Sequence, residues 1–332
     1  MKISLKVNMI CALACLIFVG CNKDDDEDDL IGNWVAKSTF NGSARASSAY
    51  FTIGSKGYMG TGFDSDDYLN DFWVYDMETN FWQQKADFPG LERSSAVGFS
   101  IGNDGYIGTG YNGDQNDELQ DFYKYNTDSN TWEQIADFGG GVRRAAIGFA
   151  SSSNGYVGTG YDGSNDKKDF WRYDPTSDTW EEIAGYGGDK RRDATSFTLG
   201  NIAYIGTGIS NGIYQEDFWS FNLDSEAWTQ LTDLDDDDDY NITRSSAVGF
   251  TISGKGYVAC GEVSGPLKSV WEYNASSDTW TERTGFELLG RQNPVIFNDG
   301  SRAFIALGRN GSYYLDDNME FFPNQTQDDD DN

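Results

Sequence analysis

Residues 93–132 read RSSAVGFSIGNDGYIGTGYNGDQNDELQDFYKYNTDSNTW. In order, this stretch holds an arginine, a small and apolar run, a Tyr followed by Gly-Thr-Gly, an acidic loop, an aromatic run and a Trp. Short apolar runs separated by Gly, Asn and Asp are typical of β-strands joined by tight turns. The unit therefore predicts four short strands, at residues 96–101, 105–110, 121–126 and 131–138.

The same unit recurs along the chain. Five segments align without gaps from the arginine to the Gly that ends the second strand, and a sixth is degenerate but in the same register. They begin at Arg45, Arg93, Arg143, Arg191, Arg244 and Arg291. The period is about 50 residues, which is in the range of a four-stranded propeller blade.

The last repeat lacks the Trp of its fourth strand, since Met319 to Phe322 is followed only by polar residues. Trp34, however, stands eleven residues before Arg45, which is the spacing of Trp82 to Arg93. We expect residues 33–40 to form the fourth strand of the last blade, because a ring closed in this way leaves no open sheet edge. The sequence therefore predicts an all-β, six-bladed β-propeller closed by its N-terminal strand.

Charge and composition exclude several functions. The 332 residues include 54 acids against 24 lysines and arginines, a formal charge of −30, and this field repels nucleic acid. Acid runs at residues 24–29, 235–239 and 328–331 are interpreted as solvated loops or tails. The chain has no His, which excludes His-dependent catalysis and His-ligated metals. Cys260 is the one Cys after residue 21, so no disulfide framework is predicted and Cys260 is interpreted as a small buried residue.

Residues 1–20 resemble a bacterial lipoprotein signal peptide. A basic start precedes an apolar run that is too short for a transmembrane helix and ends in Gly20-Cys21. Gly20 matches the small residue of the lipobox, whereas Phe18 stands where Leu is usual. We predict lipidation of Cys21; Cys15 is the competing site, and a plain secretory signal is the alternative.

Lys23, followed by Asp24 and Asp25, resembles the export signal of Bacteroidetes lipoproteins. That resemblance implies an outer-membrane lipoprotein exposed at the cell surface. The predicted organisation is a signal peptide at residues 1–20, an acidic tether at 21–31, the propeller at 32–323 and an acidic disordered tail at 324–332.

Residues 33–323 resemble the Kelch-repeat family, without the copper site of its galactose-oxidase-like members. The Kelch repeat has an arginine at the start of the first strand, a Tyr in the second, a Gly pair after it, an aromatic in the third and a Trp in the fourth. Here the third-strand aromatics are Tyr75, Tyr125, Tyr173, Phe221, Tyr273 and Phe322. The second Gly of the pair stands at Gly62, Gly110, Gly160, Gly208, Gly261 and Gly308, and Thr, Cys or Leu replaces the first.

The loops between second and third strands and the connections between blades should emerge on one face, here called the loop face. The six repeat arginines, Arg45, Arg93, Arg143, Arg191, Arg244 and Arg291, should lie at that face around the channel. They are candidates for binding an anion or a sugar, because a guanidinium offers forked donors. In the alternative, each arginine pairs with the Asp that opens the third strand, at Asp71, Asp121, Asp169 and Asp217. Ser269 and Asn318 replace that Asp in the last two repeats, so Arg244 and Arg291 are the arginines expected to be free.

Three aromatic residues open loops on the same face. Phe63, Tyr111 and Tyr161 are candidates for stacking on sugar rings, whereas the Asn, Asp and Gly that follow them are also ordinary turn residues. Asp64, Asp66, Asp67 and Asp71 offer oxygens to Ca²⁺ but do not follow the twelve-residue Ca²⁺ loop, so no metal or other cofactor is predicted.

These observations predict a surface lipoprotein that acts as a non-enzymatic binding or adhesion module for a glycan or a protein. Its contact with the membrane is through the lipid anchor, and nucleic acid is not expected as a partner. The alternative is a carbohydrate-active enzyme, because Kelch propellers include galactose oxidases and sialic-acid mutarotases. The oxidase copper site needs His, which this chain lacks. No catalytic residue is singled out by the sequence.

Overall fold

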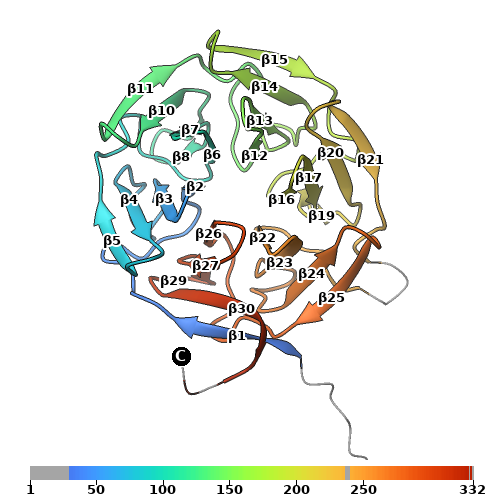
Figure 1. The fold of residues 1–332 in the computed structure, drawn as a ribbon. Coiled ribbons are helices and arrows are strands. Elements are labelled where there is room, and N and C mark those ends of the chain that lie inside the picture. The colour runs from blue at the N-terminus through green and yellow to red at the C-terminus, as the bar shows by residue number, and fades with distance from the viewer. Residues whose placement is uncertain (1–29, 236–239, 329, 331–332) are drawn as a thin grey trace, which may run out of the picture.

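The computed structural model describes residues 30–235, 240–328 and 330, and shows six antiparallel four-stranded sheets around a central axis (Figure 1). In each blade the first strand is innermost and the fourth is outermost. The predicted six-bladed propeller is confirmed. The predicted signal peptide, Cys21 and nearly all of the tether lie outside the described residues. No helix in the described ranges is long and apolar enough to cross a membrane.

The blades follow one another along the chain. The strands of blades 1 to 3 are β2 (Ala49–Ile53), β3 (Lys56–Gly60), β4 (Phe72–Asp76) and β5 (Phe81–Gln84); β6 (Val97–Ile101), β7 (Asp104–Gly108), β10 (Phe122–Asn126) and β11 (Thr131–Ile135); and β12 (Ile147–Ala150), β13 (Gly155–Gly158), β14 (Phe170–Asp174) and β15 (Thr179–Ile183). Those of blades 4 to 6 are β16 (Thr195–Leu199), β17 (Ile202–Gly206), β20 (Trp219–Asn222) and β21 (Ala227–Gln230); β22 (Val248–Ile252), β23 (Lys255–Ala259), β24 (Val270–Asn274) and β25 (Thr279–Arg283); and β26 (Val295–Asn298), β27 (Ala303–Ala306), β30 (Asn318–Thr326) and β1 (Ile31–Ala36).

Three loops between second and third strands carry short hairpins of their own. These are β8 (Tyr111–Asn112) with β9 (Asp117–Glu118), β18 (Ile209–Ser210) with β19 (Ile213–Tyr214), and β28 (Arg309–Asn310) with β29 (Tyr313–Tyr314). The hairpins give these loops a defined backbone, which matters because the loops form the surface described below.

The two ends of the chain meet in blade 6, as the position of Trp34 predicts. β1 pairs with β30 at the outer edge of that blade, and Trp34 lies opposite Phe321. Trp34 is fully buried between the rings of Phe286, from the preceding blade, and Phe321, whose centroids lie 4.7 and 4.6 Å away. β30 continues to Thr326, past the predicted end of the propeller at residue 323.

The third strand of blade 6 corrects the predicted register by one residue. Phe321, and not Phe322, takes the buried aromatic position opposite Trp34. The residue that opens this strand is accordingly Asp317 and not Asn318. Because side chains alternate across a strand, a slip of one residue exchanges its two faces. The sequence could not fix this register, because Phe321 and Phe322 are adjacent and either could take the buried aromatic position.

Small residues near the axis make room for aromatic side chains from the neighbouring blade. A Cβ on Gly105 in β7 would lie 1.9 Å from the ring of Phe51 in β2, and one on Gly256 in β23 would lie 2.1 Å from Phe197 in β16. A second-strand glycine of one blade therefore receives the first-strand Phe of the blade before it. This inter-blade contact explains why glycine recurs in strands, where it is otherwise unfavourable.

Two closed rings of backbone hydrogen bonds join the blades at the loop face. The first ring is formed by the residues two positions after each repeat arginine. The amide of each one donates to the carbonyl of the equivalent residue in the preceding blade, over 2.8–3.1 Å. In the second, the Gly that follows each second strand donates its amide to the carbonyl of the next repeat arginine over 2.7–2.9 Å, and Gly308 closes the ring by donating to Arg45. Both rings pass through all six blades, so the blades hold one another in register.

Candidate functional site

The six repeat arginines lie inside the blades and have no solvent exposure. Each Nη1 donates to the carbonyl of the residue that replaces the first Gly of the pair, namely Thr61, Thr109, Thr159, Thr207, Cys260 or Leu307. Those six residues have φ between 59° and 62°, a backbone conformation that non-glycine residues rarely adopt. The arginine therefore stabilises a strained turn at the end of each second strand.

Five of the six arginines pair with the aspartate that opens the third strand of their own blade. The pairs are Arg45–Asp71, Arg93–Asp121, Arg143–Asp169, Arg191–Asp217 and Arg291–Asp317. Burial alone would raise the pKa of Asp169, but the hydrogen bonds and charge of Arg143 outweigh it, so that pKa lies below its ordinary value. These contacts support the structural alternative for the arginines.

The expectation that Arg291 lacks an acidic partner is wrong. Its Nη1 donates to Asp317 over 2.5 Å, and the one-residue register error in blade 6 is the reason the sequence missed this pair. Arg244 does differ from the others, since in the described ranges its donors meet only carbonyl oxygens, of Asn241, Ile242, Cys260 and Ser269. Burial lowers the pKa of Arg244 to about 10. Both side chains are buried, so neither presents its guanidinium to the loop face.

The predicted loop aromatics do lie together on the loop face. Tyr111 and Tyr161 are partly exposed, and Arg144 stands between them, with its guanidinium 4.5 and 5.0 Å from the two ring centroids. The guanidinium of Arg192 also contacts Tyr161, at 5.2 Å from the centroid of its ring. Phe63 belongs to the same series, through Tyr68, which contacts both Phe63 and Tyr111 at 4.8 and 6.0 Å.

We call this series the aromatic arc. It consists of Tyr314, Phe63, Tyr68, Tyr111, Arg144, Tyr161 and Arg192, each in contact with the next. The sequence singled out three of the aromatics, Phe63, Tyr111 and Tyr161. Tyr68 and Tyr314 were missed, because they come from the returning arms of the loops, where turn residues hide the pattern.

Carboxylates fix the two arginines of the arc. Arg144 Nε lies 3.5 Å from Glu118, and Arg192 Nη1 donates to Asp166 over 2.6 Å. Asp166 also accepts the amide of Asn211 from the next blade, over 2.8 Å. The arc is therefore a preorganised surface of aromatic rings and two cations, with an acid paired to each cation.

The acids considered for Ca²⁺ have other roles. Asp71 pairs with Arg45 and accepts the indole N–H of Trp73 over 2.7 Å. Asp64 accepts the amides of Asp66 and Asp67, which is ordinary turn chemistry. Within the described residues, no group of three or more His, Cys, Asp or Glu is arranged to hold a metal ion.

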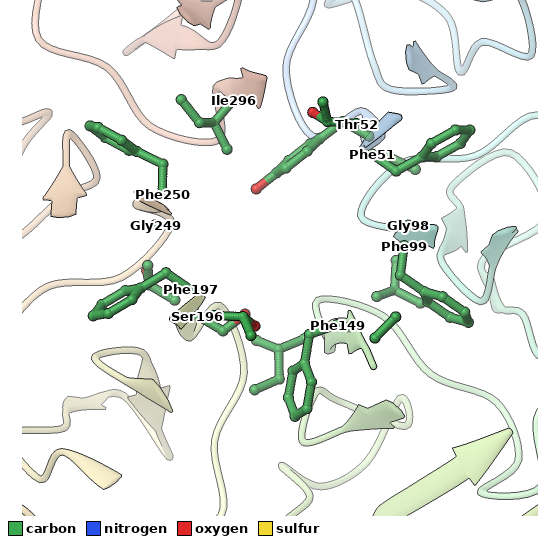
Figure 2. A pocket seen from close by; sticks show the side chains of 18 of the residues that line it. Phe51, Thr52, Gly98, Phe99, Phe149, Ser196, Phe197, Gly249, Phe250 and Ile296 are labelled. Atoms are coloured by element: carbon green, nitrogen blue, oxygen red, sulfur yellow. The ribbon is translucent and has the colours of Figure 1, made fainter. Parts of the chain in front are cut away.

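The axis of the propeller is an open channel of about 370 Å³ lined by the first strands (Figure 2). The rings of Phe51, Phe149 and Phe250 point away from the axis into the blades, so that small residues such as Gly98, Ser196 and Gly249 face the channel. A second hollow of about 100 Å³, here called the axial cup, lies where the axis meets the loop face. Tyr50 and four alanines, Ala96, Ala146, Ala194 and Ala247, line both spaces.

These features define a six-bladed β-propeller with buried repeat arginines and a partly exposed aromatic and polar site on its loop face. The family model of the KLHDC2/KLHL20/DRC7 Kelch-repeats domain matches residues 89–261. The chain belongs to the Kelch-repeat family. The solved structure of YjhT has a similar fold, with a TM-score of 0.73 over 85% of this chain and 96% of that one, at 14% sequence identity. No curated protein matches the sequence.

Proposed function

We propose that this chain is a non-enzymatic binding module that recognises a glycan through the aromatic arc. A lipid on Cys21 would hold it at the outer face of an outer membrane. The Kelch propeller serves in general as a binding or scaffold module. The choice of a glycan rests on one observation: several aromatic side chains and two arginines form a continuous, partly exposed arc on one face.

The chemistry of the arc suits a sugar. The faces of aromatic rings pack against the apolar face of a pyranose, while neighbouring carboxylates and guanidinium groups hydrogen-bond its hydroxyls. The hydroxyls of Tyr111 and Tyr161 bond within their own loops, to Asn116 and to the carbonyl of Gly163, both over 3.0 Å. These bonds fix the rings before a ligand arrives, which lowers the entropy cost of binding.

The test of this site is glycan-array binding with the purified protein, followed by titration of the best ligand. Tyr161→Ala is expected to weaken the binding of that ligand about tenfold or more, because the Tyr161 ring lies between the guanidinium groups of Arg144 and Arg192. Phe81→Ala is the control, since Phe81 is exposed but lies in β5, at the end of blade 1 away from the loop face. Equal binding by the Tyr161 variant and the wild type would contradict the site. If the purified protein binds another protein and no glycan, the proposed glycan ligand is wrong and a protein ligand takes its place.

The anchor has its own test. Cys21→Ser is expected to release the protein from the membrane fraction, because the lipid would have no acceptor. Replacing Lys23, Asp24 and Asp25 with Ala should keep the lipid but protect the protein from protease added to intact cells. Lipid found on Cys15 would correct the anchoring site. Unchanged surface digestion of the triple variant would contradict the proposed export signal.

A further inference from the structure

The axial cup contains one ionisable carboxyl group among otherwise uncharged or weakly acidic side chains. Asp193 lines it together with Ser47, Ser95, Ser246, Asn293 and Tyr50. Asp193 occupies the ring position two residues after a repeat arginine, and its amide donates to the carbonyl of Ala145 over 3.0 Å. Its side chain is 26% exposed, so a ligand entering the cup along the axis can reach it.

The fold does not require an acid at this position. The equivalent residues in the other blades are Ser47, Ser95, Ala145, Ser246 and Asn293, and all six have φ between 51° and 59°. The ring is made by backbone groups, so the side chain is free to vary. An acid placed where five neutral residues serve equally well indicates a role other than closing the ring.

The two arginines nearest to Asp193 already have other carboxylate partners. Arg192 donates to Asp166 over 2.6 Å, while its Nε lies 3.7 Å from Asp193; Arg144 lies beside Glu118. Glu262 adds a further negative charge in this neighbourhood. Burial raises the pKa of Asp193 to about 6, since the attraction of Arg192 does not offset the lost hydration. The carboxylate is therefore poorly compensated, and a cation in the cup would stabilise it.

We propose that the axial cup binds a primary ammonium group, carried by a hexosamine with a free amino group. This inference rests on the proposed glycan function and names the ligand class. An ammonium group has three donors, which match the Asp193 carboxylate and the hydroxyls of Ser47, Ser95 and Ser246 in the same cup. A cup of about 100 Å³ accepts a small head group. A single carboxylate is a poor site for a divalent ion, which takes six or more oxygen ligands.

The experiment is calorimetric titration of the purified protein with glucosamine, N-acetylglucosamine and Nα-acetyl-lysine amide. We expect glucosamine to bind at least about tenfold more tightly than its N-acetylated form, because acetylation removes the charge. Asp193→Asn should abolish that preference, and it should fold, since Asn293 occupies the same position in blade 6. Asp189→Asn, at an exposed acid two residues before Arg191, is the matched control and should keep the preference.

The outcomes separate this inference from the proposed function. Equal binding of both sugars, or an unchanged preference in Asp193→Asn, would overturn the ammonium site while leaving the glycan function in place. Binding of the lysine amide and of neither sugar would overturn the hexosamine as the ligand of the cup, while the glycan function of the aromatic arc would still be judged by the array. If none of the three binds, the ammonium site is wrong.

The pH dependence adds a second readout. The lysine amide stays cationic between pH 7.5 and 5, because an ordinary Lys has a pKa of about 10.4. The groups that act on Asp193 are Arg192, Arg144, Glu262 and Asp166. As the pH falls through about 6, Asp193 takes up a proton, so affinity should fall about tenfold by pH 5. Asp193→Asn should show no such fall, and a wild-type affinity that is flat over this range would contradict the site.

Discussion

Deletion of residues 30–40 is expected to leave a protein that does not form a stable propeller. The deletion removes β1, opens the outer edge of β30 and takes away Trp34, which is fully buried between Phe286 and Phe321. Loss of a buried Trp side chain alone costs about 3–5 kcal/mol, and a domain has only about 5–15 kcal/mol of net stability. The unpaired strand would also invite aggregation. Thermal melting and size-exclusion chromatography measure both effects.

A point variant isolates the side chain from the strand. Trp34→Ala should lower the free energy of unfolding by about 3–5 kcal/mol, whereas Phe81→Ala, which truncates a 61% exposed ring, should change it by less than about 1 kcal/mol. Adding a peptide of residues 30–40 to the truncated protein should restore part of the lost stability. A truncated protein that melts at the wild-type temperature would show that closure does not depend on β1.

Arg93→Ala is expected to lower the free energy of unfolding by about 3–5 kcal/mol, because it breaks a buried ion pair and leaves one partner uncompensated. Arg93 has no solvent exposure and donates to Leu91, Thr109 and both carboxylate oxygens of Asp121 over 2.6–2.9 Å. Its removal leaves the carbonyl of Thr109 without this donor in a turn with φ of 59°. Chemical denaturation measures the change.

Arg144→Ala is the matched control, since Arg144 follows a repeat arginine directly but is partly exposed and pairs with Glu118 over 3.5 Å. A partly exposed, long ion pair of this kind contributes about 0–1 kcal/mol. A cycle with Asp121→Asn should show that the Arg93 and Asp121 changes are not additive, because each one breaks the same pair. Equal costs for Arg93→Ala and Arg144→Ala would contradict the structural role of the repeat arginines.

The aromatic arc shows how far the sequence reached towards the site. Phe63, Tyr111 and Tyr161 could be named in advance because they open loops at the same point of each repeat, and the repeat itself brings those points to one face. Tyr68 and Tyr314 could not be named, since their place depends on how each loop folds back. Asp193 stood between two arginines and a run of small residues, and only the ring geometry showed that it lines the axial cup.

The repeat arginines show the opposite case. Their recurrence was plain, but the same pattern fits a ligand-binding ring and a set of buried ion pairs. The distinction depends on whether the guanidinium points along the axis or into the blade. The structure places five of the six against an aromatic ring of the preceding connection, such as Phe88, whose ring centroid lies 4.8 Å from the Arg93 guanidinium. The spacing of arginines along a chain does not show in which direction their guanidinium groups point.

The sequence by itself determined the fold class, the number of blades and the closure by Trp34, because each depends on a period and a spacing that six repeats report independently. The tertiary structure alone decided the register of the last third strand, the pairing of Arg291 with Asp317 and the burial of the arginines. It also decided which loop residues meet. The physical reason is that strands and turns follow from local side-chain alternation, whereas burial and contacts between blades depend on the packing of all six sheets around one axis.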